Sequence, residues 1–516
     1  MIFNDFARVE PLLREGCTHE LDASRPLDEV VADLIAIASR PMTTSAGGIL
    51  GTDLAGLGTS LRAHRHRPVR TDAILLEIRT RMNSHLVPLL TRYPYPLCSI
   101  RVMVEILARH LMPVVREALY ESRVVGLLGP RQAGKSTLAR LLISDGWGAS
   151  YITLDDAQTM AAARADPTGF VAEIEGPCVI DEIQRAPGLM LAIKQRVDVD
   201  QARGQFLIIG SANLLTLGTV RDTLPGRVEY LNLFTLSQAE IERIPEHALI
   251  AELHDGRVPS VTGAPIAASA YAKRFVAGGY PDAYTRSDAS RLRFFRSYVK
   301  SVTERDLSDI AGVRRPELPP LLLSLIASRS AGILNLASIA RDLGVDENTV
   351  NAHLKLLEDL MLVRRIPPWH RNLGQRQIKA QKVYVTDPGL LSALIGASEQ
   401  RATSDPTIKG MLFETAVVTE LIKLAAASPF PPDQFHYRDA KQREIDLVLE
   451  WPDGSLVAIE VKASSSVASD DLRALRYLRD KVGEGFKAGL ILHCGERTLP
   501  FGDRIHAVPI QVLWSA

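Results

Sequence analysis

One glycine-rich segment constrains this chain more than any other part of its sequence. Residues 129–136 read GPRQAGKS and match the pattern G-x-x-x-x-G-K-[ST] at every defined position. The segment follows a short apolar run, Val124–Leu128, and precedes helix-compatible residues that begin at Thr137. Strand, loop and helix in this order form the context that the pattern requires. Further strands alternate with helical stretches through residues 124–233, and together they predict an α/β fold with a parallel sheet.

The residue types of this loop suit a nucleoside triphosphate. Glycines let backbone N–H groups converge on phosphates, and the positive end of the helix dipole lies at the same place. We expect Lys135 to reach the β- and γ-phosphates and the Ser136 hydroxyl to ligate Mg²⁺, so the expected cofactors are ATP and Mg²⁺. The expected nucleotide contacts come from the whole loop: Gly129, Pro130, Arg131, Gln132, Ala133, Gly134, Lys135, Ser136 and Thr137.

Two acids follow the third predicted strand of this region. Cys178, Val179 and Ile180 lead into Asp181 and Glu182. Asp181, at the carboxyl end of a strand, would hold the magnesium shell, and Glu182 would polarise the attacking water. An apolar run followed by two acids also occurs by chance, but here it lies downstream of a complete phosphate-binding pattern.

Four further polar residues are candidates for contact with the nucleotide. Ser211 and Asn213 follow the apolar run 206–210 and could contact the γ-phosphate or the attacking water, or could instead cap a helix. Arg227 or Arg221 could supply positive charge to the transition state, either in the same chain or in a neighbouring subunit. Either arginine could equally form a surface salt bridge.

Composition excludes several classes of protein. The chain of 516 residues is long enough for roughly three to four domains. Its formal net charge of zero excludes a polyanion binder that acts by bulk charge. The four cysteines form no C-x-x-C pair, which argues against a disulfide framework or zinc site. Neither a secretory signal nor a membrane-length apolar run is present, so we expect a cytoplasmic protein without a membrane partner.

The pattern predicts several domains along the chain. Residues 1–102 form an N-terminal extension of uncertain status, and a start at Met103 would still give a complete ATPase. Residues 103–235 are the expected ATPase core, 236–312 a helical lid and 313–385 a winged helix. The winged-helix expectation depends on helices at 336–343 and 347–360, separated by Gly344. The stretch from Arg364 to Lys382 contains six basic residues and no acid, so it could contact DNA phosphates, although winged helices also serve in packing.

A second group of charged residues lies near the C-terminus. Glu414 shares a helix face with apolar residues, where a carboxylate is costly unless it is paired or bound to metal. Asp446 lies on one predicted strand, and Glu460 and Lys462 lie on one face of the next. Glu414, Asp446 and Glu460 could hold Mg²⁺, and Lys462 could orient or deprotonate a nucleophile, as phosphodiester cleavage requires. A folded but catalytically idle domain is the alternative.

From Met103 onward the sequence resembles prokaryotic AAA-superfamily ATPases that carry a C-terminal domain of unknown function. The matching segments are GPRQAGKST (129–137), VIDEIQ (179–184), GSAN (210–213), LPGRVEYLNL (224–233), GGYPDA (278–283), ASIARDLGV (337–345), VRRIPPWHRNLGQR (363–376), VYVTDPGL (383–390), GMLFE (410–414), EIDLVL (444–449) and AIEVKAS (458–464). The resemblance implies a winged helix followed by a restriction-endonuclease-like α/β domain at 386–516. It also implies ATP binding and hydrolysis, with catalytic roles for Glu182, Asp446, Glu460 and Lys462.

Three functions are compatible with these features. The first is an ATPase coupled to a DNA-acting or nuclease-like module. The second is a nucleotide-gated switch that binds a protein partner through an idle nuclease-like domain. A component of a toxin–antitoxin or stress-response system is a third option. The expected partners are ATP, DNA or a protein, and further copies of the chain.

Overall fold

The computed structural model describes residues 106–211, 224–261, 264–303, 315, 317–371 and 380–515. Two compact units divide the chain, Met1–Ile106 and Leu107–Ala516. The predicted extension 1–102 therefore lies outside the described residues, as do Asn213 and Arg221. The boundaries proposed for the other domains stay predictions.

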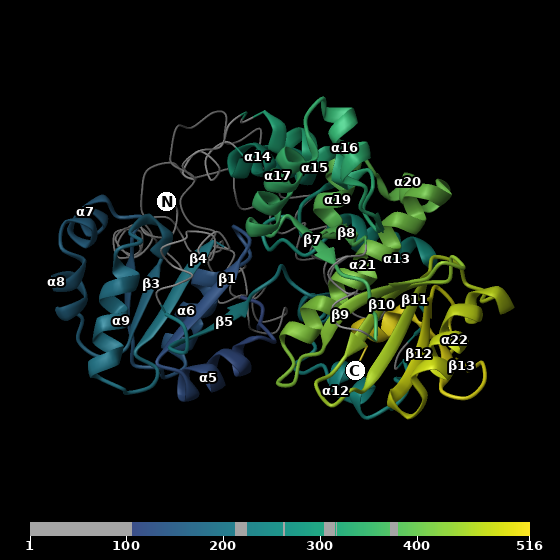
Figure 1. Cartoon of the computed structure of the whole chain (residues 1–516), viewed down its shortest axis with the longest axis horizontal. Coiled ribbons are helices and arrows are strands. Elements are labelled where there is room, and N and C mark those ends of the chain that lie inside the picture. Colours follow the sequence, from purple (N-terminus) through teal and green to yellow (C-terminus); the bar gives the residue numbers. More distant parts are fainter. Residues whose placement is uncertain are drawn as a thin grey trace, which may run out of the picture. The chain divides into compact units, whose positions relative to one another are not determined.

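A five-stranded parallel sheet forms the first part of the described chain (Figure 1). Its order is β2-β3-β4-β1-β5, with β1 Val124–Gly129, β2 Ser150–Thr153, β3 Cys178–Asp181, β4 Phe206–Ser211 and β5 Val228–Asn232. The helices around it are α5 Met112–Glu121, α6 Lys135–Ser144, α7 Ala157–Ala165, α8 Pro167–Ala172 and α9 Leu189–Val199. The sequence analysis correctly predicted an α/β fold with a parallel sheet.

Helices cover both faces of this sheet because the central strands are apolar at successive positions. Val124 of β1 joins a core with residues of α9, whereas Val125 joins a core with residues of α5 and α6. Every residue of β1 is buried, as expected for a parallel strand between two helical layers. The loop that follows β1 therefore extends from a fully buried strand.

The middle of the described chain is mainly helical. Its helices are α11 Gln238–Ile241, α12 Leu249–His254, α13 Ala268–Ala277, α14 Asp288–Ser301, α15 Leu318–Ala327, α16 Leu336–Leu343, α17 Glu347–Asp359, α19 Pro388–Ile395 and α20 Glu399–Ser404. A small antiparallel sheet, β6-β8-β7, contains Gly332–Ile333, Lys382–Val385 and Val363–Ile366 in that order. The predicted helices at 336–343 and 347–360 are confirmed, with Gly344 in the left-handed region between them.

The C-terminal part contains a six-stranded mixed sheet, β13-β14-β12-β11-β10-β9. Its strands are β9 Asp433–Arg438, β10 Glu444–Glu450, β11 Leu456–Lys462, β12 Phe486–His493, β13 Leu499–Pro500 and β14 Ile505–Pro509. Helix α21, Pro406–Ala426, packs on one face, and α22, Arg473–Val482, packs on the other. Short 3-10 turns lie at Ile183–Arg185, Ser469–Leu472, Gly483–Gly485 and Ile510–Leu513.

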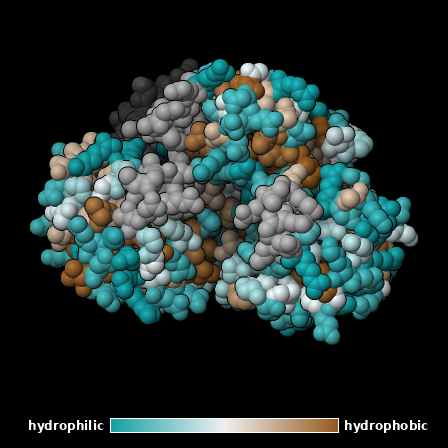
Figure 2. All heavy atoms as spheres, viewed as in Figure 1, coloured by the Kyte–Doolittle hydropathy of each residue, from teal (hydrophilic) through white to brown (hydrophobic). Residues whose placement is uncertain are grey.

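One hydrophobic core connects the middle and C-terminal parts. Its buried residues extend along the sequence from Phe234 to Trp514 and include residues of α13, α17 and α21. The face shown in Figure 2 is largely hydrophilic, with hydrophobic residues gathered near α15 and α16. Within the described ranges, no helix is both long enough and apolar enough to cross a membrane.

Candidate functional site

The carboxyl ends of three parallel strands bring the predicted nucleotide-binding residues together. Gly129 at the end of β1 is in register with Ser211 at the end of β4, and Asp181 ends β3 on the other side of β4. The Ser136 hydroxyl donates a hydrogen bond of 2.7 Å to Asp181 Oδ2. The first turn of α6 and the acidic strand end therefore meet at one edge of the sheet, where open α/β sheets bind ligands.

The backbone of the loop depends on its glycines. A Cβ atom at Gly129 would lie 2.3 Å from the carbonyl oxygen of Leu233, so a larger residue would displace β1 or the chain after β5. Gly134 caps α6 with φ at +96°, a conformation that favours glycine. Gln132 also has a positive φ, 60°. The loop thus turns sharply and leaves the amino end of α6 facing it.

Lys135 lies across this loop. Its Nζ donates to the carbonyl oxygens of Gly129, at 2.9 Å, and Pro130, at 2.8 Å, and the side chain is buried. Thr137 is exposed, and the carbonyl of Arg131 accepts a hydrogen bond of 3.3 Å from Tyr298 of α14. The loop therefore contacts both its own sheet and the helical middle part.

The two acids after β3 have different environments. Asp181 accepts from Ser136 and Tyr151 through Oδ2 and from the Glu182 N–H, at 2.9 Å, through Oδ1. Burial and the neighbouring Asp181 carboxylate raise the pKa of Tyr151, so its hydroxyl stays a donor at neutral pH. The hydrogen bonds from Tyr151 and from the Glu182 N–H thus hold the Asp181 carboxylate in its orientation toward Ser136.

Glu182 adopts a left-handed backbone conformation, with φ at 58°. A non-glycine residue in this region costs about 1 kcal/mol or more, and such strain clusters at functional sites. Burial first, and Asp181 second, raise the pKa of Glu182, and Gln184 donates a hydrogen bond to its carboxylate. The structure therefore holds a carboxylate of raised proton affinity beside the loop, as a general base requires.

The structure places Arg227 away from the nucleotide loop of its own chain. Arg227 immediately precedes Val228, which is in register with Val124 at the start of β1. The loop follows the other end of β1, roughly 17 Å away along the strand. Arg227 instead binds Asp198 of α9 through Nε, at 2.5 Å, and Nη2, at 3.2 Å. The expectation that Arg227 contacts the nucleotide in the same chain is wrong, because the residue lies at the opposite edge of the sheet.

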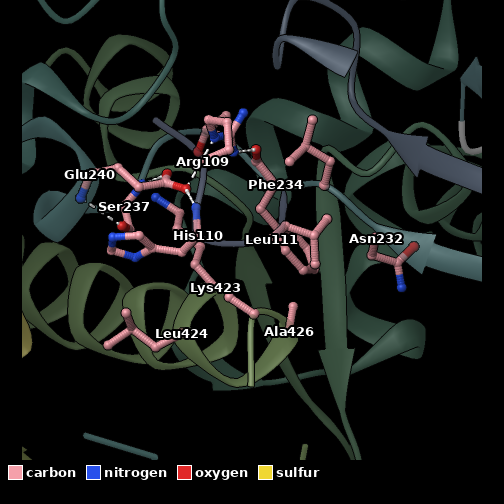
Figure 3. Close-up of a pocket in the computed structure, with 13 residues that line it drawn as sticks. Arg109, His110, Leu111, Asn232, Phe234, Ser237, Glu240, Lys423, Leu424 and Ala426 are labelled. Atoms are coloured by element: carbon pink, nitrogen blue, oxygen red, sulfur yellow. Dashed lines mark hydrogen bonds and ion pairs between the residues drawn. The ribbon is translucent and has the colours of Figure 1, made fainter. Parts of the chain in front are cut away.

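Arg109, which the sequence analysis missed, is a buried cation beside the loop. Its guanidinium donates to the carbonyl oxygens of Ala133 and Phe234, both at 2.7 Å, and to Glu240 Oε1 at 3.1 Å. Figure 3 shows Arg109 and Glu240 pointing toward one another. Glu240 also accepts from the N–H groups of His110 and Ser237 and closes a capping box on α11. One arginine therefore connects the loop backbone to α11.

From α11 the contacts continue to the long C-terminal helix α21. The Gln238 N–H donates to Glu420, and Lys423 Nζ donates to the carbonyl of Leu236 at 3.0 Å. Both acceptor and donor side chains on α21 are buried. A displacement of the loop that moves Arg109 would therefore also move the start of α11, which Glu420 and Lys423 of α21 contact.

The C-terminal acids surround a second buried cation, Lys382. Its Nζ lies 2.8 Å from Glu414 Oε1, 2.8 Å from Asp446 Oδ1 and 2.7 Å from Glu444 Oε1. Only 1% of the lysine side chain is exposed. Burial by itself would lower the pKa of Lys382, but Asp446 and the other carboxylates outweigh it and raise that pKa well above its usual range. Lys382 is therefore charged and fully paired.

This arrangement does not form the expected set of metal ligands. The described ranges contain no group of three or more His, Cys, Asp or Glu residues placed to hold a metal ion. Glu414 and Asp446 are brought together as predicted, but the Lys382 ammonium lies between them. A lysine from β8 supplies the positive charge between Glu414 and Asp446, so the Mg²⁺ site predicted at Glu414, Asp446 and Glu460 stays a prediction that this geometry does not favour. The residues present do not fit a divalent metal in this state.

Glu460 and Lys462 do share one face of β11, as strand alternation predicts. Lys462 Nζ lies 3.0 Å from Glu460 Oε1 and 3.3 Å from Asp471 Oδ1. The backbone N–H of Val461, between them, donates to Asp446 Oδ2 at 2.9 Å. Burial and the nearby Asp446 raise the pKa of Glu460. One neighbourhood therefore contains Lys382 and Lys462 with five acids: Glu414, Glu444, Asp446, Glu460 and Asp471.

The basic stretch from Arg364 to Lys382 is largely engaged within the protein. Arg364 donates to Gln434, Arg365 binds Glu358, and Lys382 is buried. Residues 372–379 lie outside the described residues. At least these three of the six basic residues are therefore held in internal contacts, which weakens the expectation of phosphate contacts.

Comparison with known proteins assigns the family. Residues 121–242 match the AAA domain, residues 268–401 a domain of unknown function (DUF8612) and residues 409–513 a domain of unknown function (DUF4143). Over 399 residues the chain is 31% identical to uncharacterized protein Rv2008c of Mycobacterium tuberculosis and to uncharacterized protein Mb2031c of Mycobacterium bovis, covering 77% of this chain and 82% of each relative. The chain belongs to the family of AAA ATPases with a C-terminal DUF4143 region.

Similarity to solved structures is weak. The Walker-type ATPase PABY2304 of Pyrococcus abyssi is 12% identical with a TM-score of 0.35, and the match covers 58% of this chain and 99% of that one. A RuvB variant of Thermotoga maritima is 21% identical with a TM-score of 0.24, over 51% of this chain and 90% of that one. Scores this low support no argument about the fold or function of this AAA ATPase.

Arg109 and Lys382 are buried cations that lie outside the AAA domain and DUF4143 matches, and Lys382 lies within the DUF8612 match. Arg109 precedes the AAA domain match, and Lys382 precedes the DUF4143 match. One signal did point to Lys382: Glu414 on an apolar helix face requires a positive partner. The sequence analysis assigned that partner to a metal ion, although a basic residue that begins a short apolar strand could also supply it.

Proposed function

We propose that this AAA ATPase binds ATP with Mg²⁺ and hydrolyses it at the carboxyl edge of its parallel sheet. The observation that carries the proposal is the hydrogen bond from Ser136 to Asp181 at the mouth of the glycine loop. A hydroxyl on the first turn of the helix and a carboxylate at a strand end are the protein groups that hold magnesium in phosphate-binding loops. Bound Mg²⁺ would neutralise charge on the β- and γ-phosphates.

The residues of this chain divide the work. The loop N–H groups and the amino end of α6 would bind the phosphates, and Lys135 would exchange its carbonyl partners for phosphate oxygens. Glu182, with its raised pKa, would orient water for attack and accept its proton. Ser211 ends the neighbouring strand in register with Gly129, and this backbone position supports the expected contact with the γ-phosphate or the attacking water.

Steady-state hydrolysis of ATP by the full chain tests this proposal. We expect Mg²⁺-dependent phosphate release that Lys135→Ala and Asp181→Asn each abolish. Lys355→Ala is the matched control, since Lys355 is an exposed lysine on α17. Hydrolysis that persists in both loop variants, or wild-type protein that binds no ATP in a calorimeter, would overturn the proposal.

A second candidate function concerns the C-terminal part. Of the two alternatives, a nuclease-like module or a nucleotide-gated switch, we favour the switch. Lys382 neutralises the expected metal site, whereas the contacts from the loop through Arg109 and α11 lead to α21. We also infer that α15, α16 and α17 with the sheet β6-β8-β7 form a winged helix, since two helices around a Gly344 turn precede two antiparallel strands.

Hydrogen exchange separates the two alternatives. A switch predicts that a non-hydrolysable ATP analogue with Mg²⁺ changes amide protection in α11 and α21, and that Lys135→Ala removes the change. A nuclease-like module predicts cleavage of DNA with Mg²⁺ that Asp446→Asn abolishes. Cleavage of this kind, without a protection change in α21, would favour the nuclease.

A further inference from the structure

The positive charge in the C-terminal acidic site comes from the protein itself. We propose that the Lys382 ammonium replaces a divalent cation in the C-terminal site, so that Glu414, Glu444 and Asp446 form a closed, metal-free site. The proposal does not rest on ATP binding or hydrolysis. Glu414 and Asp446 are two of the acids that were expected to hold Mg²⁺.

Three carboxylates surround the Lys382 ammonium group, two as hydrogen-bond acceptors (Glu414 and Asp446) and one as an ion-pair partner (Glu444). An ammonium has three N–H donors, and Lys382 Nζ lies within 2.8 Å of three different carboxylates. A buried charge is tolerated only when it is paired and hydrogen-bonded in this way, so the geometry is that of a permanent structural partner.

The carboxylates that bind Lys382 also accept hydrogen bonds from other donors. Asp446 uses Oδ1 for Lys382 and Oδ2 for the Val461 N–H at 2.9 Å. Glu414 Oε1 also accepts from the Tyr384 hydroxyl at 2.9 Å. A divalent metal needs its ligand oxygens at about 2.0–2.6 Å. It would therefore compete with these donors for the same oxygens.

Lys382 belongs to a different sheet from Glu444 and Asp446. It begins β8, which pairs with β6 and β7, whereas the acids come from α21 and β10. A metal ion and the ammonium cannot share these oxygens, because two cations would then lie within a few ångströms of one another in a buried site. Metal entry would require β8 to withdraw its first side chain.

Charge counting gives the consequence of removing the lysine. Glu414, Glu444, Asp446 and Glu460 are opposed in this neighbourhood by Lys382 and Lys462, with Arg438 3.9 Å from Glu444. A neutral side chain at position 382 would leave Glu414 and Asp446 without their cationic partner. Such a cluster would either take up protons or bind a divalent ion. Lys382→Met should therefore create a metal site that the wild type lacks.

Mn²⁺ titration of the nucleotide-free full chain tests the proposal, with bound ion measured by electron paramagnetic resonance. We expect no saturable binding by the wild type that depends on Asp446. We expect Lys382→Met to bind one Mn²⁺ at least tenfold more tightly, and the double variant Lys382→Met/Asp446→Asn to lose it. Lys355→Met, at an exposed lysine, serves as the matched control.

Two results would overturn the proposal. One is saturable Mn²⁺ binding by the wild type that Asp446→Asn abolishes, since the lysine would then coexist with the metal or leave it room. The other is a folded Lys382→Met that binds no more Mn²⁺ than the wild type. If Lys382→Met does not fold, the wild-type and Asp446→Asn titrations still decide, and Mn²⁺ should restore its folding.

Discussion

Replacing Arg109 with methionine should disturb the nucleotide loop without touching the nucleotide. The guanidinium makes three hydrogen bonds, to Ala133, Phe234 and Glu240, and only 8% of the residue is exposed. Methionine fills much of the same volume but supplies no donor. The variant therefore removes the link between the loop and α11 while leaving Lys135 and Ser136 unchanged.

The expected loss of stability follows from these contacts. Removing one partner of a buried ion pair costs about 3–5 kcal/mol. Glu240, itself 5% exposed, keeps the N–H donors of His110 and Ser237. The cost of leaving this carboxylate without Arg109 should therefore lie at the lower end of that range. Two buried carbonyls also lose a donor, at about 1–3 kcal/mol each before water enters. Since these terms overlap, we expect about 3–5 kcal/mol in total.

The loop should lose nucleotide affinity as well. Loss of the hydrogen bond to the Ala133 carbonyl should reduce the free energy of nucleotide binding by about 1–2 kcal/mol, because the loop backbone is no longer held in place. This is equivalent to about 5- to 30-fold weaker binding. A fluorescent ATP analogue measures the affinity, and urea unfolding of the full chain measures the stability. Arg203→Met is the control, because Arg203 is exposed. Glu240→Gln should be milder, since the amide oxygen still accepts hydrogen bonds.

One outcome would refute this reasoning. If Arg109→Met unfolds at the wild-type urea concentration and binds the analogue with wild-type affinity, the buried guanidinium neither stabilises the chain nor holds the loop. The contacts from the loop to α21 would then be incidental packing, and the switch would lose its structural support.

Three further predictions concern single carboxylates and one arginine. Glu182→Gln should retain analogue binding but lose at least 100-fold in ATP turnover, and equal loss of binding would contradict its role as a base. Arg227→Ala should leave analogue affinity within twofold of wild type, because Arg227 binds Asp198 at the far edge of the sheet. Burial raises the pKa of Glu420 from 4.5 to about 7, so the folded state binds its proton more tightly and stability should fall as pH rises through this window. Glu420→Gln should flatten that dependence in urea unfolding between pH 5 and 8, and an unchanged slope would assign it to other groups.

The parts of the fold that local sequence determines were predicted correctly. The apolar run at Val124 forms the central buried strand, and Gly344 separates two helices because it adopts the left-handed conformation. Asp346 caps the second helix through the Thr349 N–H, at 2.9 Å. Each of these features depends on residues within a few positions, so the periodicity and the capping residues are sufficient to predict them.

The misassigned and missed residues all depend on contacts distant in sequence. Arg227 was a plausible nucleotide ligand until the register of β5 with β1 placed it at the opposite edge. Arg109 meets Glu240 across 131 positions of the sequence, and no local pattern marks either residue as a partner of the other. Strand register decides the first case and a contact between two distant segments decides the second, and neither follows from the spacing of residues in one sequence.

The C-terminal acids show why a correct grouping can still give a wrong chemistry. Glu414 and Asp446 were predicted to lie together, and Lys382 binds both. Their spacing indicates only that buried negative charge needs a positive partner, and either a divalent ion or an ammonium can be that partner. The chemistry depends on which positive group lies between the carboxylates. Here it is the Lys382 ammonium, from strand β8 of a different sheet. Since an ammonium cannot activate water as a metal ion does, the same carboxylates that would cut a phosphodiester instead fasten β8 to the C-terminal sheet.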